Sequence, residues 1–517
     1  MMYEKFSFSP LLHQRYNMFM KSKTFPIITI ACVMSLLVSC AVPGFRMEYV
    51  NEAEEFLSMN EEPHLYDTVP VVLPHIVTDK AGFESEAEKV AVFTSASIPQ
   101  TFEIIDADTG RRAFSGVVKT KRNPGNGSAP LGYGYFTELT IPGNYYIKCA
   151  GLGESYPFVI TDDLIRDIVP DALDVLDMVR EKRITVKARD TKGAEVEKIL
   201  QGGWITDENG TQDVTVAAET MMTLLTAYEL FPMSFEEFTN DAGDIRILDQ
   251  LYHQSVWMLS LQDETSGGVY RSLYTVNDNV SVTYNLGPVD NTASAAFAAV
   301  MAKFSYIYKD VDAEYASICL KAADMAWKYL EKEKAVSSSS PDSSVLASAA
   351  AELYRASGLQ TYYTYANDLL PSNLDIEADH WNLYSSVTYM LTRKAVSVAK
   401  CQSLMKTLMK SGEVISQAAR DDSFMVSTID GDDSFESLLW NMVILSTSNY
   451  VLTNDEYASV IKNHEHYFRG RNFSSEDYIY DKDEYKLKDL RSNAAYIYML
   501  AQILSGDYFV APSDSDY

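Results

Sequence analysis

The spacing of the hydrophobic residues changes once along this chain, near residue 163, and this change constrains the fold more than any other feature. Before it, short runs rich in β-branched and aromatic residues alternate with turn sequences such as Asp108-Thr109-Gly110. About six or seven strands in such a stretch predict a small immunoglobulin-like β-sandwich across 71–162. The expected strands are 90–94, 101–105, 113–118, 135–141, 144–149 and 156–160.

After residue 163 the hydrophobic residues recur at helical spacing as far as about residue 510. Two stretches, 292–301 and 348–354, are rich in Ala, and small residues let helices approach closely. Helices without strands predict a closed double ring, an (α/α)6 barrel, across 163–510. A helical solenoid is the alternative, but no repeat of fixed length is visible. The twelve expected helices are 164–182, 214–230, 247–262, 290–308, 313–332, 344–357, 359–369, 382–395, 399–411, 435–447, 454–467 and 489–504.

The N-terminal segment has the pattern of a targeting signal. Lys21 and Lys23 precede an apolar run, Phe25 to Val38, that is too short to span a bilayer comfortably. The run ends at Ser39-Cys40 and resembles the signal peptide of bacterial lipoproteins, in which this Cys carries the lipid. We therefore expect a signal peptide over 1–39, lipidation at Cys40 and a tether over 40–70. The expected location is the bacterial cell envelope, at the outer membrane, facing the periplasm or the surface.

The charge of the chain disfavours nucleic acid as a partner. The 43 Lys and Arg stand against 72 Asp and Glu, a net charge of −29. Residues 1–39 hold four bases and one acid, so their removal makes it −32. Phosphate binding needs clustered bases, so a neutral partner such as a polysaccharide or oligosaccharide is expected. The 34 Tyr suit a sugar ligand, although core and surface Tyr of a large helical protein explain them equally well.

Several motifs, in order, resemble glycoside hydrolase family nine, the inverting cellulases. Gly202-Gly203-Trp204 and the downstream Ala227–Pro232 (AYELFP) resemble its GGW and AYELFP segments. The last-helix Asn493 and the β-rich region fit as well, the latter as the N-terminal immunoglobulin-like module of the family. Further matches are Leu261–Asp263 with Gly267–Tyr270, Pro288–Ala302, Ala349–Gly358 and Gly470–Asn472. The resemblance covers about 71–505 and implies hydrolysis of β-glucans.

The catalytic positions of that family are substituted. The resemblance places its two Asp on Thr206 and Asn209, and its general acid Glu on Leu487. None of these side chains can exchange a proton as a carboxyl group does. The nearest substitutes are Asp207 and Glu208 as base and Glu484 as acid, although a solvated turn and a mixed-charge surface segment are the simpler interpretations. Asp241–Asp244 spells the family's DAGD but stands downstream of the matching register, so we interpret it as a polar turn.

The expected sugar contacts are also reduced. The loop that follows Gly470–Asn472 in the family, with its NPHHR motif, has no counterpart here. Trp204 and Tyr270 occupy matched positions and are the expected substrate-binding rings. Trp381 and Trp440 are better explained as core residues.

No metal or cofactor is expected from the sequence. His464-Glu465-His466 lacks the HExxH pattern, and His residues two apart on a helix point in different directions, so a surface helix end is the simpler interpretation. The acidic Asp430–Asp433, or Asp241 with Asp244, could bind a structural Ca²⁺, but an acidic helix start explains the former better. Five Cys without a CxxC pair predict neither a thiolate metal site nor a disulfide framework.

Three functions stay open at this point. The favoured hypothesis is a lipid-anchored, family-nine-like protein that binds a neutral polysaccharide or assists its breakdown without the family's own chemistry. The second is an active inverting glycosidase with relocated carboxylates. The third is a structural or interaction protein that binds no sugar.

Overall fold

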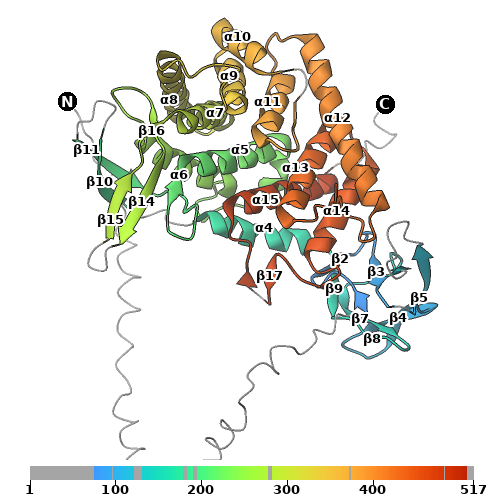
Figure 1. Cartoon of the computed structure of the whole chain (residues 1–517). Coiled ribbons are helices and arrows are strands. Elements are labelled where there is room, and N and C mark those ends of the chain that lie inside the picture. The colour runs from blue at the N-terminus through green and yellow to red at the C-terminus, as the bar shows by residue number, and fades with distance from the viewer. Residues whose placement is uncertain are drawn as a thin grey trace, which may run out of the picture. The chain divides into compact units, whose positions relative to one another are not determined.

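The computed structural model describes residues 75–95, 97–121, 131–177, 183–189, 195–277, 282–371, 374–482 and 484–508 (Figure 1). The expected signal peptide, Cys40 and the tether lie outside these residues. Among the helices described, none is both long and apolar enough to cross a membrane.

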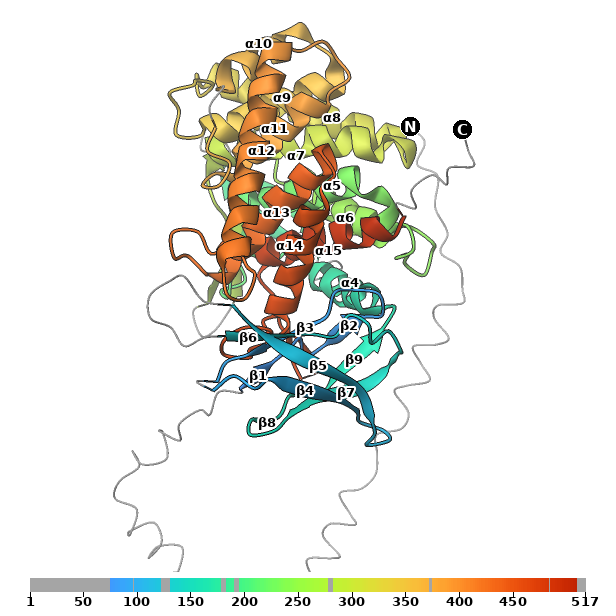
Figure 2. The same ribbon diagram turned by 90° about the vertical axis from the view of Figure 1, so that its right-hand side faces the viewer.

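The first described region is a β-module with an aromatic core. Its strands pair in the order β1-β3-β6-β5-β4-β7-β9-β2, with β8 against β7, and Figure 2 shows β5, β4 and β7 side by side. Phe83, Phe93, Phe102 and Phe158 fill the space between the layers. The strands are β1 Ile76–Val77, β2 Gly82–Glu84, β3 Val90–Phe93, β4 Thr101–Asp106, β5 Arg112–Lys121, β6 Leu131–Tyr135, β7 Gly143–Cys149, β8 Gly153–Glu154 and β9 Phe158–Thr161.

One predicted strand of this module is wrong. The apolar residues of 135–141 suggested a strand, but β6 ends at Tyr135. Phe136 and Leu139 then lie in a turn with both side chains buried, and Ile141 is exposed. Buried side chains in a turn imitate the alternation of a strand, which explains the error.

The second region contains the twelve predicted helices, and the barrel prediction is confirmed. The six inner helices (α5, α7, α9, α11, α13 and α15) are buried along most of their length, whereas the outer six each bury one face. The helices are α4 Leu164–Asp174, α5 Val214–Leu230, α6 Arg246–Ser260, α7 Asn291–Ile307, α8 Ala313–Lys332, α9 Ser343–Ser357, α10 Gln360–Leu369, α11 His380–Leu391, α12 Val398–Asp421, α13 Phe435–Val451, α14 Asp455–Phe468 and α15 Leu490–Tyr508.

The inner helices form a ring through direct packing. Helix α5 packs against α7 and α15, α9 packs against α7 and α11, and α13 packs against α15. Between α11 and α13 the rings of Tyr384 and Trp440 meet edge to face, with centroids 5.9 Å apart. Contacts between the first two turns of α5, α11 and α15 place the N-terminal ends of these helices on one side of the ring.

The prediction that this region lacks strands is wrong. A five-stranded sheet lies in the connections around α5 and α6, in the order β11-β10-β15-β14-β12. The predicted helix 164–182 ends at Asp174, where a 3-10 turn over Val175–Asp177 follows. The strands are β10 Arg183–Arg189, β11 Glu195–Gln201, β12 Gln212–Asp213, β14 Ser272–Asn277 and β15 Val282–Leu286, and the short pairs are β13 Val269–Tyr270 with β16 Val289–Asp290 and β17 Tyr480–Asp481 with β18 Glu484–Tyr485.

Near the C-terminal ends of the inner helices, buried charges connect α5, α7 and α9. The Lys303 ammonium lies 2.5 Å from Glu229 and 3.5 Å from Glu352, and its side chain is 1% exposed. Arg355 donates to the other oxygen of Glu229, and Tyr306 donates to Glu352 at 2.8 Å. Burial works to raise the pKa of Glu229, but Lys303 and Arg355 outweigh it and hold this pKa below its usual value.

We expect Lys303→Met to destabilise the protein by about 3–5 kcal/mol, because it leaves buried carboxylates short of a counter-charge. Chemical denaturation followed by circular dichroism would measure the change. The matched control is Lys328→Met, which breaks an exposed pair with Asp324 and should cost less than about 1 kcal/mol. Equal losses in both variants would contradict a special role for the buried network.

Candidate functional site

The Gly-Gly-Trp segment is held in place by packing. Gly203 has φ +92°, and a Cβ there would come within 2.6 Å of the Trp257 ring. The Gln212 amide donates to the carbonyl of Gly203 at 2.8 Å. The Trp204 indole donates to the carbonyl of Leu176 at 2.8 Å, and its ring is 2% exposed. This motif therefore builds the core of the barrel.

The prediction that Trp204 and Tyr270 are sugar-binding rings is corrected by their burial. Tyr270, in β13, is 0% exposed, so neither ring offers a face to a ligand in this structure. Trp440 lies in the core as predicted, and its indole donates to the carbonyl of Ile376 at 3.0 Å. Trp381, expected in the core, is partly exposed.

Thr206 and Asn209 lie in a tight turn before α5. The Thr206 hydroxyl donates to the carbonyl of Thr211 at 2.9 Å and accepts the Asp213 amide at 3.0 Å. Asp207 accepts the Thr211 and Asn209 amides, each at 2.9 Å, and these backbone hydrogen bonds lower its pKa. The carboxylate of Asp207 therefore closes the turn, as expected for a solvated turn rather than a catalytic base.

The position at which the resemblance placed the general acid lies in the core. Leu487 is 8% exposed and packs in the main hydrophobic cluster of the barrel. Glu484 is exposed on β18, opposite Asp481 of β17. Asp207 and Glu208 are likewise exposed, in the turn before α5, so all three candidate carboxylates lie at the surface.

Three other polar side chains do meet at the N-terminal ends of the inner helices. Glu219 lies in the second turn of α5, His380 begins α11, and Arg491 is the second residue of α15. Glu219 contacts His380 Nδ1 at 2.5 Å through one oxygen and Arg491 at 2.8 Å through the other. The His380 ring stacks on Trp440 with centroids 3.6 Å apart. We call Glu219, His380, Arg491 and Trp440 the mouth cluster.

The mouth cluster combines a fixed anion with accessible donors. Burial works to raise the pKa of Glu219, but the His380 hydrogen bond and the Arg491 charge outweigh it and lower this pKa. The Glu219 side chain is 13% exposed, whereas His380 is 34% and Arg491 46% exposed. A carboxylate on Nδ1 orients the imidazole and leaves Nε2 for another partner. The cluster can therefore present His380 and Arg491 to a polar ligand, beside the partly exposed Trp381.

No sequence pattern reveals this cluster, because its members come from four separate helices. Glu219 and His380 are 161 residues apart, and no motif spacing connects them. The signals that were present are weak: one acid inside the otherwise apolar start of α5, and His380 directly before Trp381 at a helix start.

Other carboxylates at this end of the ring serve as helix caps. Asp213 caps α5, Asp290 caps α7 and Asp379 caps α11 through backbone N–H groups. Arg271 lies 3.2 Å from Asp213 and 3.6 Å from Asp290, and so joins two of the caps. Asp489 accepts the Ser492 amide at the start of α15. Such caps stabilise helix ends and hold these carboxylates in place.

Two further predictions concern metals. Asp432 accepts the Ser434 amide at 3.0 Å just before α13, as an acidic helix start would. In the other acidic loop, Asp241–Asp244, the backbone amide of Asp244 donates to the Asn240 side chain.

The segment His464-Glu465-His466 is buried, with exposed fractions of 0%, 1% and 7%, so the prediction of a surface helix end is wrong. Asp79 and Phe83 of the β-module cover His466, whereas His464 contacts Ser427 and Val460 inside the barrel.

Family models match both parts of the chain. The model described as "Glycosyl hydrolase family 9" matches residues 177–507, more than half of the chain. The model described as "Cellulase N-terminal ig-like domain" matches residues 72–154.

Individual relatives are distant. Endoglucanase D of Acetivibrio thermocellus is 22% identical over 399 residues, covering 66% of this chain and 63% of the relative, so the chain spans less than two thirds of its length. A xyloglucan-specific endo-beta-1,4-glucanase of Bacteroides ovatus is 24% identical over 308 residues, covering 50% of this chain and 51% of the relative. A solved structure titled "Bacteroides ovatus GH9" superposes with a TM-score of 0.71 at 18% identity, covering 83% of this chain and 99% of that one. At this identity the superposition shows the fold alone.

We expect Glu219→Gln to lower the free energy of unfolding by about 1.5–3 kcal/mol at pH 7, because it removes the charge from two hydrogen bonds. The pKa of Glu219 is lower in the folded than in the unfolded state. The ionised Glu219 therefore stabilises the fold fully at any pH above its pKa in the unfolded chain, about 4.3. This stabilisation is lost as the pH falls through the lower pKa of Glu219 in the folded chain. Unfolding measured from pH 7 to pH 3 should show the two proteins converging at the acid end. Glu208→Gln, in the exposed turn, is the control and should change little at any pH.

Proposed function

The chain belongs to glycosyl hydrolase family 9, and from this premise we propose that it acts on β-glucan-type polysaccharide as a binding protein without the family's hydrolytic chemistry. Relatives named as an endoglucanase and a xyloglucan-specific glucanase support this class of ligand. The mouth cluster supports a neutral ligand in particular, because the Glu219 charge offsets that of Arg491.

This proposal rests on the residues that occupy the positions matched to the catalytic groups of the family. Inverting hydrolysis needs a carboxylic acid and a carboxylate base on opposite sides of the sugar. Here the matching positions hold Thr206, whose hydroxyl is bound into a turn, exposed Asn209 and buried Leu487. General acid and general base each contribute roughly 10²–10⁴-fold to rate, so their loss together removes most of the catalysis.

The ligand contacts that remain are polar donors beside an aromatic ring. His380 and Arg491 are partly exposed and are held by Glu219, so little ordering is needed when they meet sugar hydroxyls. Trp381 is partly exposed and meets Tyr384 edge to face, with centroids 5.9 Å apart. A ring fixed in this way can stack on the flat face of a glucose unit.

The purified chain should hydrolyse β-1,4-glucan and xyloglucan at least about 10⁴-fold more slowly than the Acetivibrio endoglucanase, while a β-glucan affinity gel still retards it. Trp381→Ala and His380→Ala should reduce the retardation, whereas Glu208→Gln should not. Turnover within tenfold of the endoglucanase would overturn the proposal. If such turnover fell in Asp207→Asn, Glu208→Gln or Glu484→Gln, relocated carboxylates would explain it. If the gel retained nothing, the chain would be a structural component instead.

We also propose that the chain is anchored to the bacterial envelope by lipid on Cys40, which follows a short apolar run with basic flanks. The full-length chain expressed in a bacterium should partition with membranes, and Cys40→Ser should release it or block its processing. The control is Cys401→Ser, which changes a cysteine of α12 and should leave the partition unaltered. Equal partition of all three proteins would exclude the anchor.

A further inference from the structure

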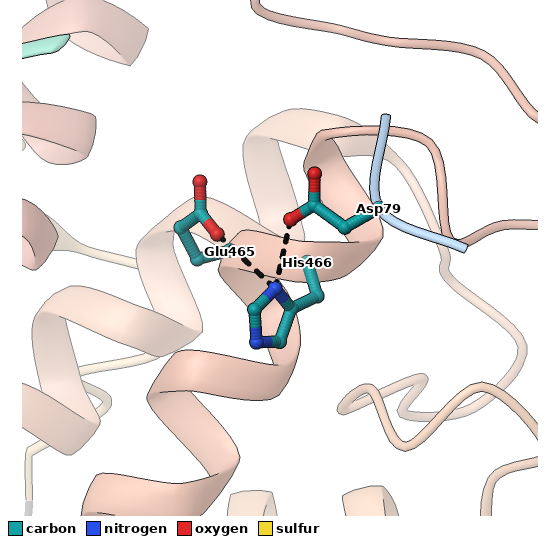
Figure 3. Close-up of side chains that lie close together, drawn as sticks. All are labelled: Asp79, Glu465 and His466. Carbon is teal, nitrogen blue, oxygen red and sulfur yellow. Dashed lines mark hydrogen bonds and ion pairs between the residues drawn. The ribbon is translucent and has the colours of Figure 1, made fainter. Parts of the chain in front are cut away.

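Three potential metal ligands meet where the β-module contacts α14 (Figure 3). Asp79 precedes β2, and Glu465 and His466 lie in the last turn of α14. One ligand atom from each residue lies within 4.8 Å of the other two, and all three residues are buried. His466 Nδ1 is 2.8 Å from Asp79 Oδ2 and 3.5 Å from Glu465 Oε2. We call Asp79, Glu465 and His466 the junction triad.

The spacing of these atoms suits a metal ion. With metal–ligand bonds of about 2.0–2.1 Å, ligand atoms in a tetrahedral site lie about 3.3 Å apart. The distances from His466 Nδ1 to Asp79 Oδ2, 2.8 Å, and to Glu465 Oε2, 3.5 Å, lie just below and just above this value. One imidazole with two carboxylates, completed by water, is a ligand set that Zn²⁺ accepts.

The surroundings of the triad hold its ligands in place. Asp79 Oδ1 accepts the Ala81 amide at 2.7 Å and the Gly82 amide at 3.0 Å, which leaves Oδ2 directed at His466. The Phe83 ring lies 4.8 Å from the His466 ring, and the Lys80 amide donates to the carbonyl of Arg469 at 2.9 Å. Such outer contacts orient the ligands of protein metal sites.

A second observation points to a missing partner. Glu465 is 1% exposed, yet its Oε1 makes no hydrogen bond. The cation beside it, Arg469, approaches no closer than 3.9 Å and lies 3.2 Å from Asp477 instead. A small cavity of about 20 Å³ borders Glu465 and His466, which is room for about one water molecule. A buried carboxylate with an unpaired oxygen is costly, and a cation bound through its other oxygen, Oε2, would compensate its charge.

We propose that the junction triad binds one Zn²⁺ ion, with water as a further ligand, and that the ion fastens the β-module to the barrel. Two carboxylates balance the ionic charge, and the single imidazole favours zinc over calcium or magnesium. Asp79 and His466 are 387 residues apart, so the unfolded chain offers no preformed site. Zinc therefore binds the folded chain and stabilises it. This inference is independent of the glycan-binding proposal, because the triad shares no residue with the mouth cluster.

The test uses the chain stripped of metal by a chelator and then titrated with Zn²⁺ in a non-chelating buffer. Calorimetry should show one site per chain, and the thermal unfolding temperature should rise with zinc. Glu465→Gln and Asp79→Asn keep the side-chain shape and should each weaken zinc binding at least tenfold. Their apparent affinity and circular dichroism are measured together, so that loss of fold is not mistaken for loss of the site.

His253→Ala is the matched control, because His253 lies 3.4 Å from Asp249 on the surface of α6 and could hold zinc adventitiously. This variant should bind zinc as the parent does. The proposal is overturned if the parent chain binds no zinc, if the two triad variants bind it as tightly as the parent, or if the control alone loses it. Binding of Ca²⁺ in preference to Zn²⁺ would overturn the assignment of the ion.

Discussion

The ring of inner helices depends on the pairing of a few buried charges. Glu229, Lys303, Glu352 and Arg355 lie near the C-terminal ends of α5, α7 and α9, where the helices are otherwise apolar. Any one of them alone would be a buried charge without compensation, so they hold three helices in one arrangement.

Most motifs shared with the hydrolases have structural roles in this chain. Gly203 lies against Trp257, Trp204 fills the core, and Asn493 accepts the Tyr485 hydroxyl and donates to the carbonyl of Ala172. The positions expected to be catalytic, 206, 209 and 487, lie in the segments leading into α5 and α15. In this chain the shared motifs therefore serve folding, and they do not by themselves establish catalysis.

The sequence predicted the helices far better than the site. Helical spacing is local, and all twelve helices were found, with α5 and α8 matched residue for residue. The sheet around β10 and β15 was missed because the parallel pairing of Lys187 with Asn285 joins distant segments. The mouth cluster and the junction triad depend on similar long-range contacts. Trp204 and Tyr270 were matched correctly to motifs but wrongly expected to bind sugar, because a motif does not reveal which way a ring faces.

The turn at Thr206 bears on which side chains can stand at this position. Its hydroxyl donates to the carbonyl of Thr211 and accepts the amide of Asp213, the residue that caps α5. A carboxylate at this position would face a carbonyl oxygen that it repels and would have no proton to donate. An acidic residue placed there alone would therefore disturb the start of the helix. The hydrogen bonds that set this turn thus favour a hydroxyl over a carboxylate at position 206.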